Sequence, residues 1–446
     1  MVILIKAAQL LLSLSLLVII HEFGHFIFAR IFKTRVEKFY LFFNPWFSLF
    51  KMKKGDTEYG IGWLPLGGYV KISGMIDESM DREAMKRPPQ PWEFRSKPSG
   101  QRLLIMLGGV LFNVLFAFLI YSMILFAWGE KYLPTQNVKY GIVCDTLALN
   151  MGLHHGDKIL TIDNHQVEDF HNVIPEIVYK GAKSIQVDRG GQMVNIAVPA
   201  SFVSEYIELM RKFKGKKGFV YFAYPFVVRK FEAGYPAEDA GIKIEDRIIG
   251  INGQDLAYFD LFVMEIRKHA GDSVTINVDR NGQKMDFPLV VPSDGMIGVH
   301  PTDPKSFFEL KEIRYSFFAS FPAGVKKGIE TISSYLKDLK LIFNPETKAY
   351  KSLGGFIAIG NIFPSIWNWQ VFWNMTAFLS IMLAVLNVLP IPALDGGHVF
   401  FLGFEIITGK KPNDRFMEVA QIVGMLLLLA LVLYANGNDI IRLFQK

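Results

Sequence analysis

Long apolar stretches alternate with polar ones along this chain of 446 residues. Four stretches are nearly free of charge and long enough, or nearly so, for the roughly 20 residues that a bilayer-spanning helix needs. The pattern predicts a polytopic α-helical membrane protein with four transmembrane helices, at about residues 2–28, 103–128, 371–389 and 419–434.

Charge along the chain predicts how these helices are oriented. The loop between the first two stretches holds twelve Lys and Arg residues between 33 and 97, and the turn before the fourth carries Lys410, Lys411 and Arg415. Basic loops stay in the cytoplasm. Both termini and the region 130–369 are therefore expected outside. No small-x-small cleavage site follows the first apolar core, so we expect a retained helix rather than a signal peptide.

The cytoplasmic loop begins with an aromatic, Gly-rich segment. Residues 59–73 are typical of a β-hairpin that turns at residues 64–68. Its apolar character suits an element that dips into the membrane beside the first helix, although an ordinary soluble hairpin would have the same pattern. Residues 77–98 are polar and Pro-rich, which predicts a surface loop.

An internal repeat occupies the middle region. Residues 184–192 match 275–283, and residues 152–164 match 241–253, at an offset of about 90 in both pairs. The repeated strings resemble PDZ domains, which bind extended peptides at a sheet edge. Whether these two grip peptide or act only as steric filters stays open. The following segment has an amphipathic pattern, broken near Pro322, and lies either in the membrane interface or on the second repeat.

His21, Glu22 and His25 form a His-Glu-x-x-His run at the end of the first apolar stretch. Two His at i and i+4 share one helical face and can bind one Zn²⁺, and the Glu can serve as general base. Ionisable groups within a membrane span are usually functional, so an incidental occurrence is the weaker reading. The single cysteine, Cys144, excludes disulfides and Cys-based metal sites, which leaves His and carboxylate ligands.

A third ligand is needed. Asp395 follows the third apolar stretch in a segment rich in Pro and Gly. Alone it reads as a helix-end turn, but the predicted topology places it at the same membrane side as His21 and His25.

These motifs together resemble the site-2 protease family of intramembrane metalloproteases, in particular its bacterial members with two tandem PDZ domains. The resemblance rests on residues 21–25, 65–70, 108–113, 354–360 and 387–397 and covers essentially the whole chain. It implies one zinc ion on His21, His25 and Asp395, and Glu22 as catalytic base. It also implies substrate-binding residues, namely Asn113, Asn387, Gly62, Trp63, Leu64, Pro65, Leu66, Gly67, Gly68, Tyr69, Val70 and Lys71.

The expected function is therefore hydrolysis of peptide bonds within transmembrane segments, in a bacterial inner membrane. The resemblance implies single-pass membrane proteins as substrates, such as an anti-sigma factor or remnant signal peptides. We expect a monomer with no nucleic-acid partner. A PDZ scaffold with an inactive metal site and a zinc transporter are the competing classes. The expected regions are residues 1–30, 31–101, 102–129, 130–225, 226–301, 302–369, 370–398 and 399–446.

Overall fold

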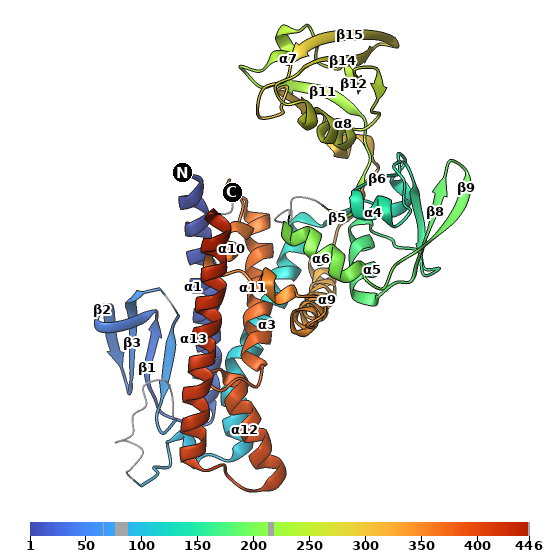
Figure 1. The fold of residues 1–446 in the computed structure, drawn as a ribbon. Coiled ribbons are helices and arrows are strands. Elements are labelled where there is room, and N and C mark those ends of the chain that lie inside the picture. Colours follow the sequence, from blue (N-terminus) through green and yellow to red (C-terminus); the bar gives the residue numbers. More distant parts are fainter. Residues whose placement is uncertain (66, 76–87, 213–217, 445–446) are drawn as a thin grey trace. The chain divides into compact units, whose positions relative to one another are not determined.

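A computed structural model describes residues 1–65, 67–75, 88–212 and 218–444 (Figure 1). The chain divides into two compact units, each described here by itself. The membrane unit comprises residues 1–129, 314–343 and 350–446. The repeat unit comprises residues 130–313 and 344–349.

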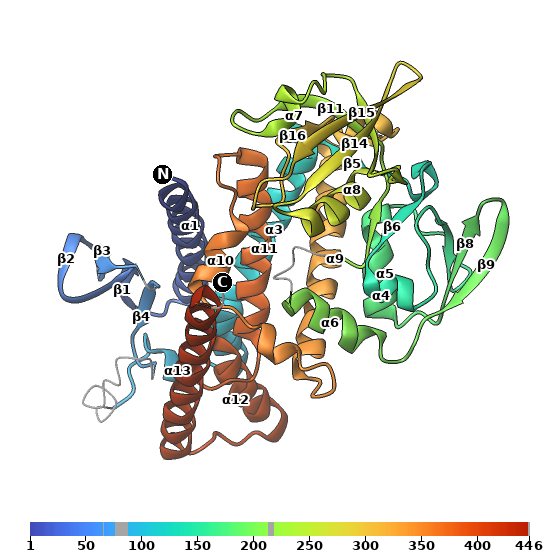
Figure 2. The same cartoon turned by 45° about the horizontal axis from the view of Figure 1, so that its top comes forward.

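Four apolar helices of membrane-spanning length occur in the described residues, which confirms the prediction. They are α1 (Val2–Ile31), α3 (Ser99–Trp128), α11 (Trp369–Val388) and α13 (Asp414–Phe444). Both views show them as a bundle (Figure 2). The boundaries extend beyond the apolar stretches because the helical hydrogen-bond ladder continues into polar residues.

Glycines allow the first two of these helices to touch. A Cβ added at Gly24 of α1 would lie 2.2 Å from the carbonyl oxygen of Gly108 on α3, and one at Gly108 would lie 2.5 Å from that of Gly24. Only glycine permits such backbone contact, which is how membrane helices gain packing contacts in a lipid solvent. The contact lies beside His25, so it fixes α3 against the His-Glu motif.

Among the described residues, the membrane unit also contains the α-helices α9 (Phe317–Phe343), α10 (Phe356–Ile362) and α12 (Asp395–Thr408). The sequence pattern missed α12. Helix α9 belongs to the membrane unit, where Gly324 and Gly328 lie against Ser122 and Phe118 of α3, so its placement on the second repeat was wrong. A break near Pro322 was also wrong. This proline lies in the second turn, where it removes a single backbone donor.

A four-stranded sheet stands beside α1, in the order β2-β3-β1-β4. Its strands are β1 (Val36–Leu41), β2 (Phe43–Lys54), β3 (Thr57–Leu64) and β4 (Tyr69–Ile72). The predicted hairpin at residues 59–73 is wrong, because its two strands, β3 and β4, do not pair with each other. Strand β1 lies between β3 and β4, parallel to β3 and antiparallel to β4. The hairpin is instead β2–β3, and β4 forms the edge of the sheet.

The repeat unit contains the same order of elements twice, as the predicted internal repeat would require. A strand, a short helix, a strand, a helix and a two-stranded hairpin follow one another twice. The first set is β6 (Ile142–Cys144), α4 (Thr146–Asn150), β7 (Lys158–Ile162), α5 (Val173–Lys180), β8 (Ser184–Arg189) and β9 (Gln192–Ala197). The second is β11 (Phe226–Phe231), α7 (Pro236–Asp239), β12 (Arg247–Ile251), α8 (Phe259–Ile266), β14 (Ser273–Arg280) and β15 (Gln283–Val290).

Smaller elements lie within, between and around the two repeats. They are β5 (Glu130–Tyr132), α6 (Phe202–Lys212), β10 (Val220–Phe222), β13 (Gln254–Asp255), β16 (Val299–Pro301) and β17 (Lys311–Ile313). Each repeat has its own apolar core of Ile, Val and Phe side chains. The identity of the repeats as PDZ domains stays a prediction.

The same ion pair recurs in both repeats. Arg189 binds Asp157 at 2.8 Å and the carbonyl oxygen of Gly152, and Arg280 binds Asp246 at 2.7 Å and that of Gly241. In each case two guanidinium nitrogens meet the two oxygens of one carboxylate, the strongest geometry for this pair. The two repeats therefore share an equivalent ion pair as well as similar sequence.

Candidate metal centre

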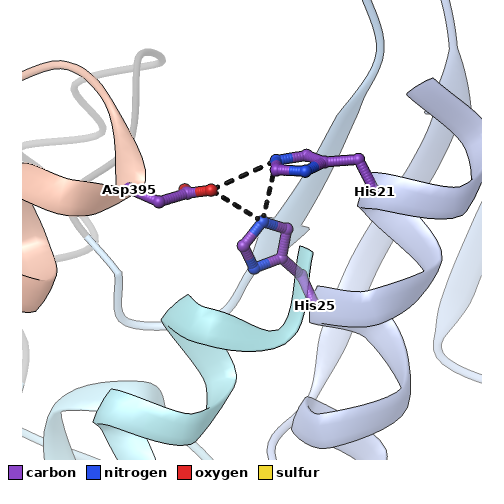
Figure 3. A group of neighbouring side chains, drawn as sticks. All are labelled: His21, His25 and Asp395. Atoms are coloured by element: carbon purple, nitrogen blue, oxygen red, sulfur yellow. Dashed lines mark hydrogen bonds and ion pairs between the residues drawn. The ribbon is translucent and has the colours of Figure 1, made fainter. Parts of the chain in front are cut away.

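Helix α1 presents His21 and His25 on one face, one turn apart, toward α3 and α12 (Figure 3). Both imidazoles are buried, at 9% and 7% exposure. The helix continues without interruption to Ile31, so its backbone holds the two Cα atoms at a fixed separation. This is the local geometry that the i, i+4 spacing predicts.

Asp395 reaches the same point from the other end of the chain. Residues 389–394 form a tight turn after α11, in which Ala393 has a φ of 84°. A residue with a Cβ rarely adopts this left-handed conformation, so the turn is strained where it delivers the aspartate. Asp395 is then the first residue of α12, and its side chain points at the two imidazoles (Figure 3).

The three side chains form a nearly equilateral triangle of ligand atoms. His21 Nε2 lies 3.3 Å from His25 Nε2, and Asp395 Oδ2 lies 3.1 and 3.3 Å from these two nitrogens. Atoms that share a tetrahedral zinc ion at about 2.0–2.1 Å are separated by about 3.3 Å. The donor set and its spacing therefore fit a zinc ion. Within the described chain, no other group of His, Cys, Asp and Glu has this arrangement.

Contacts behind the imidazoles fix their ring orientation. His25 Nδ1 lies 2.8 Å from the backbone oxygen of Ile105, to which its N–H donates, so Nε2 is left as the free lone pair. The amide of Asn113 lies 3.2 Å from His21 Nδ1. Asn113 Oδ1 is buried and has no hydrogen-bond partner in the described structure. If the side-chain amide of Asn113 is rotated by 180°, this oxygen accepts a hydrogen bond from His21 Nδ1–H. His21 is then also prepared to bind through Nε2.

Gly109 on α3 makes room for both rings. A Cβ at this position would lie 2.5 Å from His25 Nε2 and 2.6 Å from His21 Cε1. Any larger residue must displace an imidazole, since atoms in a packed interior do not approach so closely. Gly109 lies within the range 108–113 that carries the family resemblance, but neither its contact with the imidazoles nor that of the Ile105 carbonyl can be predicted from residue type.

The triangle opens into a cavity of about 860 Å³ within the membrane unit. Glu22, Asn387 and His398 line it, as does Gln421 from α13. The amide nitrogen of Asn387 lies 3.3 Å from His21 Nε2, so this side chain stands at the mouth of the site. A carboxylate and an amide thus face the same space as the metal-binding atoms, which suits proton transfer and carbonyl binding.

The predicted substrate segment divides into two parts. Leu64 and the stretch Gly67–Lys71 line the cavity, whereas Gly62, Trp63 and Pro65 do not. Leu66 lies outside the described residues. Gly62 pairs with Ser48 of β2, and the Trp63 indole donates to the backbone oxygen of Pro45. Asn113 lies behind His21 rather than in the cavity wall, so its substrate role stays a prediction.

Comparison with known proteins assigns the family. The sequence profile of peptidase family M50, the site-2 proteases, matches residues 9–431. The chain belongs to this family.

Among its relatives, the regulator of sigma E protease of Haemophilus influenzae is 28% identical, and the match covers 97% of this chain and 98% of the relative. The RseP protease of Yersinia pestis is 28% identical over 99% and 100%. That of Escherichia coli is 27% identical over 98% of each chain.

Membership and structure agree on the enzyme class. This M50 protein is a metalloendopeptidase of the site-2 protease type, with four helices apolar enough to span a membrane. A Neisseria meningitidis relative named as a zinc metalloprotease is 30% identical over 97% of this chain and 98% of its own. The family resemblance that the motifs predicted is confirmed.

Proposed function

We propose that His21, His25 and Asp395 hold one zinc ion and that the protein cleaves peptide bonds inside the membrane. The observation that carries this proposal is the triangle of two Nε2 atoms and one carboxylate oxygen, with all three sides between 3.1 and 3.3 Å. It lies between apolar helices, where such groups are costly unless they serve a function.

A bound zinc ion supplies Lewis-acid chemistry, which polarises a carbonyl and makes water more acidic. Glu22, in the cavity wall next to His21, takes a proton from the attacking water and later gives it to the leaving amine. The tight turn of residues 389–394 and the Ile105 contact hold the ligand side chains in place, so little reorganisation is needed during the reaction.

Strand β4 is the element that we assign to substrate binding. It pairs with β1 on one side and is the last strand of the sheet, and its residues Tyr69, Val70 and Lys71 line the cavity. A helical substrate must unwind to expose a peptide bond, and an edge strand can pair with the unwound backbone. Their place in the cavity lining supports this strand and the preceding glycines as the part of the predicted segment that binds substrate.

Proline substitution tests the strand. Proline removes a backbone N–H, so Val70→Pro should reduce cleavage about tenfold more than Val70→Ala while zinc content stays the same. If both variants lose the same amount of cleavage activity and bind the same amount of zinc, β4 does not pair with the substrate backbone. Scanning from Tyr69 to Ile72 should give an alternating profile, since hydrogen-bonding direction alternates along a strand.

The basic loop and the apolar helices support an orientation with both termini and both PDZ-like repeats outside the cytoplasm. Cys144 cannot report on this, because burial raises the pKa of its thiol to about 12. Cysteines introduced at Ser96 and Ser201, both exposed, are suitable. An impermeant thiol reagent on spheroplasts should label position 201 and spare position 96, and the reverse pattern would overturn the orientation.

The names of several relatives indicate a role in regulating sigma E, which suggests single-pass membrane proteins such as an anti-sigma factor as substrates. Comparing membrane proteomes of cells that contain the wild-type protein or Glu22→Gln identifies them. A Glu22→Gln variant that binds zinc and does not cleave supports the protease. A variant that still cleaves removes Glu22 from the mechanism. A scaffold or a zinc transporter would show no cleavage in either form.

A further inference from the structure

A second cleft, lined by polar residues, lies at the C-terminal end of the His-bearing helix α1. It has a volume of about 510 Å³ and is separate from the catalytic cavity. Three segments form its walls: the end of α1 with the residues that follow it, the turn between β2 and β3, and the stretch before α3. Its lining residues are Arg30, Lys33, Thr34, Arg35, Asp56 and Trp92.

Backbone hydrogen bonds hold these walls together. The N–H of Arg35 donates to the carbonyl oxygen of Trp92 at 2.9 Å, and Ser73 N–H donates to that of Arg35 at 3.0 Å. The ammonium of Lys97 donates to the carbonyl oxygen of Lys33 at 3.2 Å. The walls of the cleft are therefore held in place by hydrogen bonds between the three segments.

The cleft carries an excess of positive charge. Three cations face one carboxylate, that of Asp56, which lies 3.7 Å from the Arg35 guanidinium and is largely exposed. Basic residues near a helix C-terminus also interact favourably with the helix dipole, and this accounts for Arg30 without any ligand. It does not account for Arg35 or for the aromatic wall provided by Trp92.

Thr34 provides an independent observation. Thr34 is one of the residues that line the cleft, it is 2% exposed, and its buried hydroxyl has no hydrogen-bond partner among the described residues. A buried hydroxyl without a partner is costly, and natural structures usually supply one. A phosphate oxygen is a strong acceptor for this hydroxyl, and the surrounding cations neutralise its charge.

The position decides which phosphate source to expect. Helix α1 is one of the candidate membrane spans, and its last residues, Arg30 and Ile31, lie where such a span reaches the membrane surface. Basic pockets at this level bind anionic headgroups, and tryptophan prefers the same interface. We propose that this cleft binds the phosphate of an anionic phospholipid headgroup.

Native mass spectrometry of the full-length protein, titrated with phosphatidylglycerol or phosphatidylcholine, tests this proposal. Wild type should retain phosphatidylglycerol at least about tenfold more tightly than phosphatidylcholine, because each cation near a headgroup contributes about a fivefold effect. The triple variant R30Q/K33Q/R35Q should lose this preference. The control K51Q/K53Q/K54Q removes the same charge from strand β2 and should keep it.

Variants of Thr34 test the proposal even if the triple variant does not fold. Thr34→Val, which keeps the shape, should weaken phosphatidylglycerol binding about fivefold, and Thr34→Ser should restore it. Equal losses in the triple variant and its control would reduce the effect to general surface charge and overturn the proposal. Displacement of the lipid by millimolar inorganic phosphate would assign the cleft to free phosphate instead, and would also overturn it.

Discussion

Asp395 of the membrane unit and Asp246 of the second repeat are both largely buried, but their oxygens meet opposite kinds of partner. Asp246 accepts two hydrogen bonds from Arg280 and one from the backbone N–H of Lys243, all at 2.7 Å. Asp395 Oδ2 has no hydrogen bond in the described structure, and its neighbours are the Nε2 atoms of His21 and His25.

This is the difference that we expect between a structural carboxylate and a metal-binding one. Every oxygen of Asp246 has a donor, so the group stabilises its repeat and needs nothing further. Asp395 faces lone pairs that repel it unless a proton or a cation lies between them. A protein retains such an arrangement only when something else completes it, and the spacing of the three atoms fits zinc.

Removing the unsatisfied carboxylate should have the largest effect. Asp395→Ala leaves two ligands, so we expect cleavage to fall about a thousandfold or more, beyond the 10–100-fold loss typical of outer-shell changes. Asp246→Ala should leave the rate per folded molecule unchanged. Cleavage of a membrane substrate by purified protein measures both. A similar loss in the two variants would abolish the distinction between the carboxylates.

Crowding the imidazoles should have the next largest effect. Gly109→Ala places a methyl group 2.5 Å from His25 Nε2, so the rings must move and zinc affinity should fall about 10–100-fold. Gly100→Ala is a matched control on the same helix, because a Cβ there has no neighbour within 4 Å. Competition with a chelator measures the affinities. Unchanged zinc binding in Gly109→Ala would contradict the observed ring positions.

Breaking the satisfied pair should affect stability alone. Arg280→Gln leaves the Asp246 carboxylate without its charged partner, which should lower the free energy of unfolding of the second repeat. Lys284→Gln, at an exposed position on β15, is the control. Hydrogen exchange of amides in β12 and β14 of the full chain measures the change. Loss of zinc in Arg280→Gln would show that the repeat supports the metal site.

Two carboxylates of the second repeat should respond to pH with opposite sign. Burial alone would raise the pKa of Asp246, but the hydrogen bonds from Arg280 and from the backbone N–H of Lys243, together with the charges of these two residues, outweigh it and hold the pKa below its usual range. Its stabilising contribution is present above about pH 4 and is lost as pH falls through the lowered pKa. Burial raises the pKa of Asp260 to about 6. Its carboxylate therefore destabilises the repeat as pH rises from about 4 to 6.

Asp260→Asn isolates this smaller effect. At pH 8 the variant should be more stable than wild type by about 3 kcal/mol, and at pH 4 the two should be equal. Hydrogen exchange of the second repeat at both pH values checks the prediction. A constant difference across this range would mean that Asp260 titrates normally in the folded protein.

The sequence predicted features that depend on local periodicity. Four apolar helices, the His-Glu motif on one face of α1 and the repeat at an offset of about 90 all follow from residue spacing. The position of Asp395 could be inferred only through topology and family resemblance, because its partners lie some 370 residues earlier. Helix α12 was missed, since its Gly-rich start resembles a turn.

Strand pairing and other contacts between distant segments could not be predicted from the sequence. The segment from Tyr59 to Ser73 has the pattern of a hairpin, yet β1 inserts between its two strands. Pairing partners are set by tertiary packing, and a strand pattern does not specify them. The same limit applies to Gly109, Ile105 and Thr34, whose contacts appear only when distant segments meet.

The zinc content of the purified protein, with and without Asp395, tests the central claim most directly. The account predicts one zinc ion per wild-type chain and X-ray absorption that indicates nitrogen and oxygen ligands with no sulfur, in line with the single buried Cys144. His21→Ala, His25→Ala and Asp395→Ala should each remove most of the metal. Full zinc occupancy in Asp395→Ala, with a folded protein, would contradict the claim that this carboxylate completes the site.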